Sequence, residues 1–193
     1  MNEIWIVLLF IAAAAVIVYL FPVFFTDDNN KFKKYRKLKS EQIDEIPDEE
    51  LEAAITEWLF AKIDNKGTTE FSIVNALARP CKYFYSIYVI TEEICNGSIA
   101  QCCINSTRFF MKYAENGFRD IGAENLAEIL SKANAIFDEF LKEHDEKISS
   151  LAEICGISEL DTLTDEFKNS ADLENLSTLV IDYIRKNAEY FGD

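Results

Sequence analysis

A stretch of 22 apolar residues near the start of the chain limits where the rest of the chain can fold. Residues 4–25 (IWIVLLFIAAAAVIVYLFPVFF) contain no charged side chain. As a helix rising about 1.5 Å per residue, this stretch would span about 33 Å, and the hydrocarbon core of a bilayer is about 30 Å thick. Trp5 and Tyr19 lie near its two ends, where interfacial aromatic residues are common. The sequence therefore predicts a single transmembrane helix, with residues 1–25 as a membrane anchor.

The next segment is basic. Residues 26–40 (TDDNNKFKKYRKLKS) carry six Lys and Arg residues against two Asp residues. Because basic residues flank the cytoplasmic side of a membrane helix, this basic linker predicts a single-pass protein of the inner, cytoplasmic membrane with a cytoplasmic C-terminal domain. A cleaved signal peptide is the alternative, although no basic segment precedes the apolar stretch and no clear cleavage site follows it.

Residues 41–193 form the third part, which is strongly acidic. They carry 31 Asp and Glu residues against 13 Lys and Arg residues, a net charge of −18. This length suffices for one domain with a hydrophobic core. Apolar residues recur at helical spacing through most of it, and three Pro and six Gly residues in the whole chain leave few breaks. The predicted fold is all-α, a compact multi-helix bundle preceded by the transmembrane helix.

Helix boundaries follow from capping residues and breaks. The run 83–94 (YFYSIYVITEEI) has the aromatic and β-branched content of a strand, but its length and its continuation into two Glu residues favour a buried helix. The predicted helices are 48–65, 69–77, 80–94, 98–103, 107–121, 124–144, 149–155, a brief turn at 161–167, and 173–191.

Catalytic and metal-binding patterns are missing from the sequence. The single histidine, His144, lies in a charged stretch without a legible nucleophile partner, and no phosphate-binding glycine loop occurs. The five cysteines lack metal-ligand spacing, so we expect buried, reduced thiols, with metal binding as a remote alternative. The sequence predicts no enzyme, no cofactor and no metal site.

Residues 93–106 (EICNGSIAQCCINS) carry a more specific pattern. This stretch resembles a family signature, Glu-Val-Asn-Asn-Gly-Gly-Phe-x-Gln-Tyr-Phe-x-Asn-Ser, with Cys102 and Cys103 in place of the Tyr-Phe pair. Segments around 120–133 and 160–191 resemble later blocks of the same family, so the resemblance covers about residues 48–193. The family is a bacterial all-helical domain of unknown function, typified by an acidic, dimeric DNA-mimic protein.

The residues that carry this resemblance have a structural interpretation. Polar side chains around a tight turn could join helix ends by hydrogen bonds, and we prefer this interpretation to a ligand site. The family-signature residues are Glu93, Asn96, Gly97, Gln101, Asn105 and Gly122.

The resemblance implies a function in which surface carboxylates imitate the phosphates of duplex DNA. The expected partners are the lipid bilayer and a protein with a basic surface, with no direct contact to nucleic acid; a homodimer is compatible with the resemblance. The candidate acidic binding surface consists of Asp138, Glu139, Glu143, Asp145, Glu146, Asp165, Glu166, Asp172 and Glu174. The alternative is a membrane-anchored scaffold or immunity-type interaction protein without DNA mimicry, which predicts an exposed apolar patch instead.

Overall fold

The structure, a computed structural model, describes residues 31–64, 69–144 and 153–193. Within these ranges every regular element is an α-helix or a 3₁₀ helix, which confirms the predicted all-α fold. In the same ranges no helix is both long and apolar enough to cross a bilayer. The predicted anchor, residues 4–25, lies outside the described residues.

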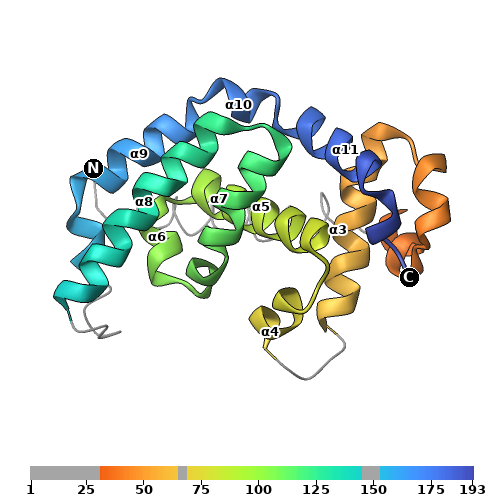
Figure 1. Ribbon diagram of the computed structural model, residues 1–193, viewed down its shortest axis with the longest axis horizontal. Helices are drawn as coiled ribbons and strands as arrows, with labels where there is room; N and C mark the ends of the chain where they lie inside the picture. The colour runs from red at the N-terminus through yellow and green to blue at the C-terminus, as the bar shows by residue number, and fades with distance from the viewer. Residues whose placement is uncertain (1–30, 65–68, 145–152) are drawn as a thin grey trace, which may run out of the picture.

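The α-helices surround a central helix, α5 (Figure 1). Helix α5 (Arg79–Asn96) packs against α3, α4, α6, α7 and α9, and α8 covers α7 and α9. Residues 83–94, whose composition also suited a strand, form part of helix α5. Phe84, Ile87, Ile90 and Ile94 recur at helical spacing and are buried in the core. The other elements are η1 (Lys33–Lys37), η2 (Ser40–Glu45), α3 (Asp48–Asp64), α4 (Glu70–Asn75), α6 (Ile99–Ile104), η3 (Ser106–Phe110), α7 (Met111–Ile121), α8 (Glu124–Glu143), α9 (Ser158–Lys168), α10 (Ala171–Glu174), α11 (Leu176–Lys186) and η5 (Ala188–Tyr190).

Three predicted boundaries are wrong. The predicted turn at 161–167 is the full helix α9, because its buried residues already begin at Leu160. The predicted helix 173–191 is three elements: Ser170 caps a short α10, α11 begins after Asn175, and the chain leaves α11 at Asn187. The predicted helix 107–121 begins as 3₁₀ turn η3 before α7. The predicted helix 149–155 falls largely outside the described residues.

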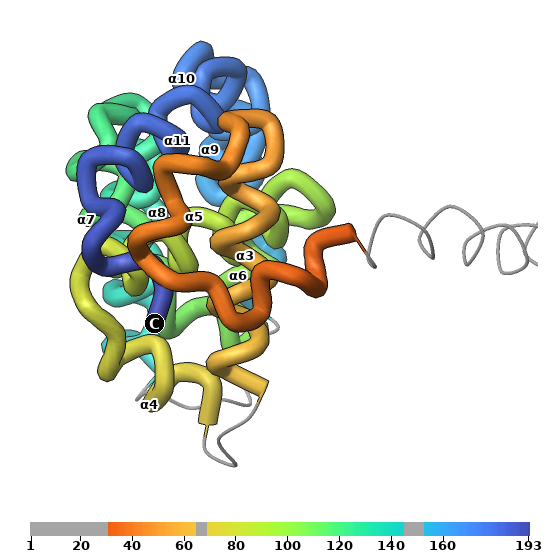
Figure 2. Tube along the Cα trace, turned by 90° about the vertical axis from the view of Figure 1, so that its right-hand side faces the viewer, coloured from red at the N-terminus to blue at the C-terminus, as the bar shows by residue number. Residues whose placement is uncertain are grey.

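Part of the predicted basic linker folds onto the domain. Figure 2 shows the segment from residue 31 through η2, in which η1 packs against α3 and η2 packs against η5. Leu38 and Ile43 are buried, and the backbone N–H of Asp193 donates to the Leu38 carbonyl at 2.9 Å. Arg185 of α11 donates to the Ile43 and Ile46 carbonyls and pairs with Asp48. Residues 31–46 are therefore a structural part of the acidic domain.

Gly192 allows the C-terminal residues to lie directly against the backbone of residues 38–40. Its φ is +109°, a left-handed conformation that favours glycine. A Cβ atom at this position would lie 2.3 Å from the backbone nitrogen of Ser40. The close approach seats Phe191 in the core, where its ring meets Phe84 edge to face at 6.0 Å.

Candidate functional site

The family-signature residues build the turn between α5 and α6. Ser98 caps α6 by accepting a hydrogen bond from the Gln101 backbone N–H at 3.1 Å. Asn105, at the other end of α6, donates to the Glu93 carboxylate at 2.5 Å. A Cβ at Gly97 would lie 2.2 Å from the Gln101 side-chain oxygen, so the side chain of Gln101 packs directly over the glycine. These contacts lock the end of α5 to α6.

Gly122 has a separate structural task at the end of α7. Its φ is +88°, its N–H donates to the Arg119 carbonyl, and the next N–H, of Ala123, donates to the Phe118 carbonyl. This pair of bonds is a Schellman motif, which ends a helix with a left-handed residue. It turns the chain so that α8 packs back along α7.

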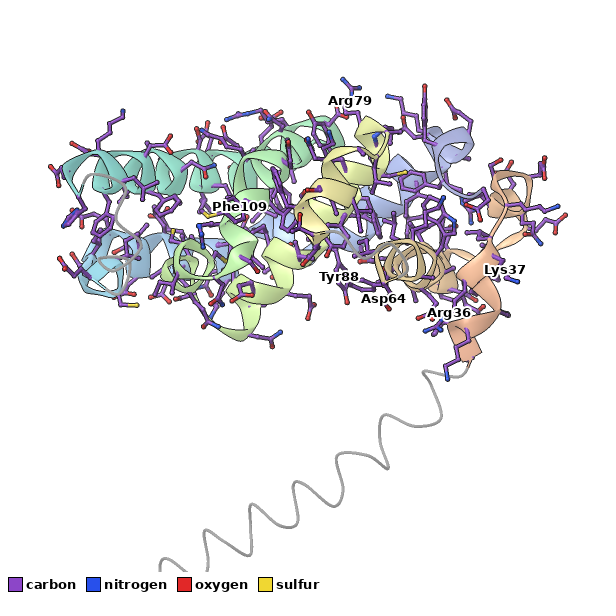
Figure 3. The ribbon with its side chains drawn as sticks, turned by 90° about the horizontal axis from the view of Figure 1, so that it is seen from below. Arg36, Lys37, Asp64, Arg79, Tyr88 and Phe109 are labelled. Carbon is purple, nitrogen blue, oxygen red and sulfur yellow. The ribbon has the colours of Figure 1, made fainter. Side chains whose placement is uncertain are left out.

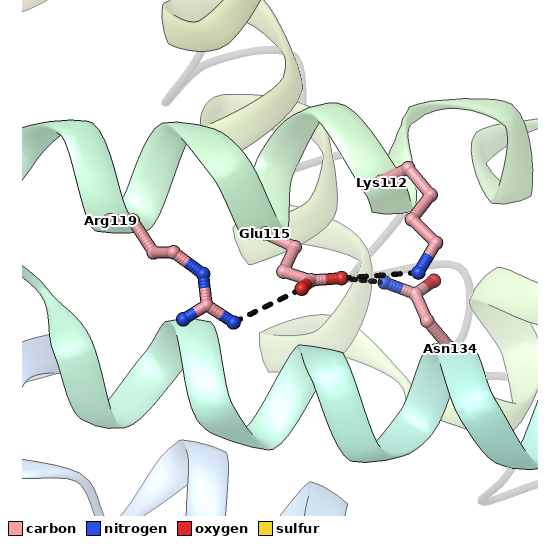
Figure 4. Close-up of polar contacts among 4 residues, drawn as sticks. All are labelled: Lys112, Glu115, Arg119 and Asn134. Atoms are coloured by element: carbon pink, nitrogen blue, oxygen red, sulfur yellow. Dashed lines mark hydrogen bonds and ion pairs between the residues drawn. The ribbon is translucent and has the colours of Figure 1, made fainter.

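A buried carboxylate joins these two helices (Figure 4). Glu115 of α7 accepts hydrogen bonds from Asn134 of α8 at 2.8 Å and from Arg119 at 3.1 Å, and Lys112 lies 3.5 Å away. Burial alone would raise the pKa of Glu115, but these donors outweigh it and hold the pKa below its usual value. Glu115 therefore stays ionised in the helix interface and belongs to the fold.

The predicted acidic binding surface is divided between two ends of the α8–α9 layer. Asp138, Glu139 and Glu143 are exposed on the C-terminal half of α8. Asp172 lies at the other end, where its carboxylate accepts two hydrogen bonds from Asn125 at the start of α8. Asn125 and Asp138 are about 20 Å apart along the axis of α8. Asp172 thus supports the start of α8.

The remaining members of this predicted surface are also distributed. Asp165 and Glu166 are exposed on α9, and Glu174 is exposed at the end of α10. Asp145 and Glu146 lie outside the described residues. Those predicted carboxylates that the structure describes are spread over α8, α9 and α10 and do not share a single concave site.

A concave acidic surface that the sequence did not indicate lies around Tyr88, where α3, α4, α5 and α6 meet. Three adjoining hollows of about 450, 440 and 60 Å³ all include Tyr88 in their lining. Within the described part of the chain, no Lys or Arg lines any of the three. We call this surface the Tyr88 face; it is lined by the carboxylates Glu49, Glu52, Glu57, Glu70, Glu92 and Glu93 and by the rings of Phe32, Phe60, Tyr85 and Tyr88.

Negative charge converges on this face. Burial and then the nearby Glu92 raise the pKa of Glu52, against a hydrogen bond from Ser177 that lowers it. Burial, Glu92 and Glu52 together raise the pKa of the Tyr88 hydroxyl. Burial is the larger cause of both shifts, and the like charges of Glu52 and Glu92 add to it.

The chain's own basic segment borders the Tyr88 face. Lys31 and Lys34 pair with Glu50 at 2.7 and 3.6 Å, and Arg36 pairs with Glu57 at 2.5 Å. Figure 3 shows Tyr88, Asp64 and Arg36 on one side of the molecule, near α3. The segment therefore compensates one edge of the face and leaves its centre acidic.

The cysteines do not all follow the prediction. Cys81, Cys102 and Cys103 are buried, and burial raises the pKa of each thiol, to about 12 for Cys81 and Cys103, so all three stay protonated. Cys95 and Cys155 are exposed, which corrects the expectation of burial, because they lie at the solvent side of the end of α5 and of the turn before α9.

His144 lies at the end of α8. Its Nδ1 is 2.9 Å from the Phe140 carbonyl oxygen and its ring stacks on Phe140. Among the described residues no group of three or more His, Cys, Asp or Glu side chains is placed to hold a metal ion.

The sequence alone does not predict the Tyr88 face, because its carboxylates come from separate helices. Tyr88 and Glu92 are four residues apart on α5 and share a helix face, a signal readable from the sequence. Nothing in the linear order indicates that Glu52 of α3 lies opposite them. The pair Glu92 and Glu93 could be read only as one more solvated carboxylate pair in an acidic chain.

Fold and surface together define an acidic, all-helical domain with a concave carboxylate face. A family model described as DMP19-like protein matches residues 75–187, more than half of the chain. The chain therefore belongs to the DMP19-like protein family. No curated protein and no solved structure matches it. The matched residues contain the α5 and α6 side of the Tyr88 face, whereas Glu49, Glu52, Glu57 and Glu70 precede them.

Proposed function

We propose that the protein is a membrane-tethered acidic binding module that acts as a DNA mimic, occupying the basic surface of a nucleic-acid-binding protein. Duplex DNA presents one negative charge per about 1.7 Å of helix axis, and its partners bind largely through that field. A domain with a net charge of −18 competes for the same basic surface. The Tyr88 face carries the proposal, because it combines six carboxylates with a concave shape and, in the part of the chain that the structure describes, no lining cation.

The proposal includes the tether and the assembly. Residues 4–25 anchor the protein in the inner membrane, and the domain faces the cytoplasm, where it holds a basic partner at the membrane. The protein forms a homodimer, catalyses no reaction and does not contact nucleic acid itself.

Capture from lysate tests the partner. The full chain, purified in a neutral detergent, serves as bait for native lysate, and bound proteins are eluted with rising salt or with duplex DNA. We expect a nucleic-acid-binding protein that elutes in both cases, because the salt screens exposed charges and DNA competes for the same surface. A partner that resists salt and DNA would refute mimicry.

A second candidate function, a scaffold or immunity-type interaction, has one supporting observation. Phe109 is 48 % exposed, and its ring packs 5.4 Å from that of Phe71, which stacks on Tyr113 at 6.3 Å. Exposed apolar clusters mark protein contacts. Replacing Phe109 with Ser would weaken a salt-resistant partner and leave a salt-sensitive one unchanged.

A further inference from the structure

We infer, resting on the proposed function, that the Tyr88 face recognises arginine side chains on a protruding segment of the partner protein. The face thereby selects guanidinium groups over other cations and supplies the main anchor of the complex.

Apart from Glu57 at one edge, the carboxylates of the face have no ion pair within the described residues. Glu57 forms its ion pair with Arg36. Four others accept hydrogen bonds from neutral groups, which orient a carboxylate without cancelling its charge: Glu52 from Ser177, Glu70 from Tyr85, Glu92 from Asn96 and Glu93 from Asn105. A cation from outside would therefore meet carboxylates that are already held in position.

The aromatic side chains distinguish arginine from lysine. Phe60 meets Tyr88 and Tyr85 edge to face, with ring centroids 5.8 and 5.9 Å apart, so the rings have fixed orientations. A guanidinium group stacks on such rings while its N–H fork binds a carboxylate, whereas an ammonium group is compact and strongly hydrated. Rings placed among carboxylates therefore favour arginine.

Two unsatisfied hydroxyl groups add hydrogen-bonding capacity. Thr107 lines the largest hollow and Thr91 the smallest, and the buried Oγ1 atom of each has no hydrogen-bond partner within the described residues. Buried polar groups usually have partners. The Thr91 and Thr107 hydroxyl groups beside the hollows therefore keep hydrogen-bonding capacity that no group of the described residues uses.

The size of the face suits several side chains. The two larger hollows, about 450 and 440 Å³, fall within the range of about 300–1,000 Å³ that is usual for ligand sites. They adjoin through Phe60 and Tyr88, which line both. Neighbouring arginines of one segment can thus occupy adjacent hollows.

Peptide titration tests this inference without the native partner. A fluorescein-labelled oligoarginine peptide and an oligolysine peptide of equal length are titrated against the full chain in a neutral detergent, and binding is followed by anisotropy. The variant E52Q/E92Q removes two charges from the face, and D138N/E139Q removes two from α8 as its matched control. Tyr88→Leu removes the central ring and leaves a smaller apolar side chain in its place. Circular dichroism checks that each variant is folded.

We expect oligoarginine to bind the wild type more tightly than oligolysine, about tenfold weaker binding to E52Q/E92Q, and a change within about twofold for D138N/E139Q. Tyr88→Leu should remove the preference for arginine. Equal losses in the two double variants, or equal affinities of the two peptides, would overturn the inference. If oligoarginine fails to bind while lysate still yields a DNA-displaceable partner, the inference is wrong and the proposed function stands. If the peptide binds as expected and no such partner appears, the proposed function fails instead.

Discussion

Replacing Glu115 with Ala should destabilise the domain by about 1–5 kcal/mol. The Asn134 amide, which is buried, loses its acceptor at 2.8 Å, and an unsatisfied buried donor costs about 1–3 kcal/mol. The pairs with Arg119 and Lys112 add about 0–1 kcal/mol each, because both cations are partly exposed.

A double-mutant cycle separates these contributions. Urea unfolding, followed by circular dichroism, is measured for Glu115→Ala, Asn134→Ala and the double variant. We expect a coupling of about 1–2 kcal/mol, since the second substitution removes the amide that the first leaves unpaired. Glu128→Ala, at an exposed carboxylate of α8, is the control and should change stability by less than about 0.5 kcal/mol. An effect of Glu115→Ala as small as that of the control would refute the reasoning.

Three further predictions concern pH, backbone and thiols. The pKa of Glu115 is lower in the folded state than in the unfolded state, where it is near 4.5. The contribution of Glu115 to stability is therefore complete above the unfolded pKa and disappears as pH falls through the folded pKa. Below the folded pKa, thermal melts of wild type and Glu115→Gln should converge. Gly192→Ala should cost at least about 2 kcal/mol by thermal unfolding, whereas Gly156→Ala, with open space around it, should be neutral. Maleimide should label Cys95 and Cys155 in the native protein and the three buried thiols only after unfolding; native labelling of Cys102 would contradict the packing of α6.

Local rules predicted most of the helices. Thr69 and Ser98 cap α4 and α6, Pro80 lies in the first turn of α5, and Gly122 ends α7, and these residue types are the usual signals for helix starts and ends. Each of these signals acts over about four residues. The break at Asn175 was missed because the apolar spacing continues across it.

Long-range contacts explain what the sequence could not supply. Residues 31–40 look like a linker because they are rich in Lys, but Leu38 is buried through contacts with the chain end at Asp193. The acidic runs near 138–146 and 165–174 stand out in the sequence as candidates for a binding surface. Glu52, by contrast, joins a concave surface only because α3 packs beside α5. Charge density along the chain therefore predicted an acidic surface, and tertiary packing decided which carboxylates share a concave face.

Capture of the partner by matched charge variants tests whether the Tyr88 face is the surface that binds it. Full-length wild type, E52Q/E92Q and D138N/E139Q are used as baits under the same low-salt conditions, and the recovered DNA-displaceable protein is quantified. We expect a loss of about tenfold for E52Q/E92Q and near wild-type recovery for D138N/E139Q. Retention by E52Q/E92Q together with loss in D138N/E139Q would contradict this expectation and place the binding surface on α8.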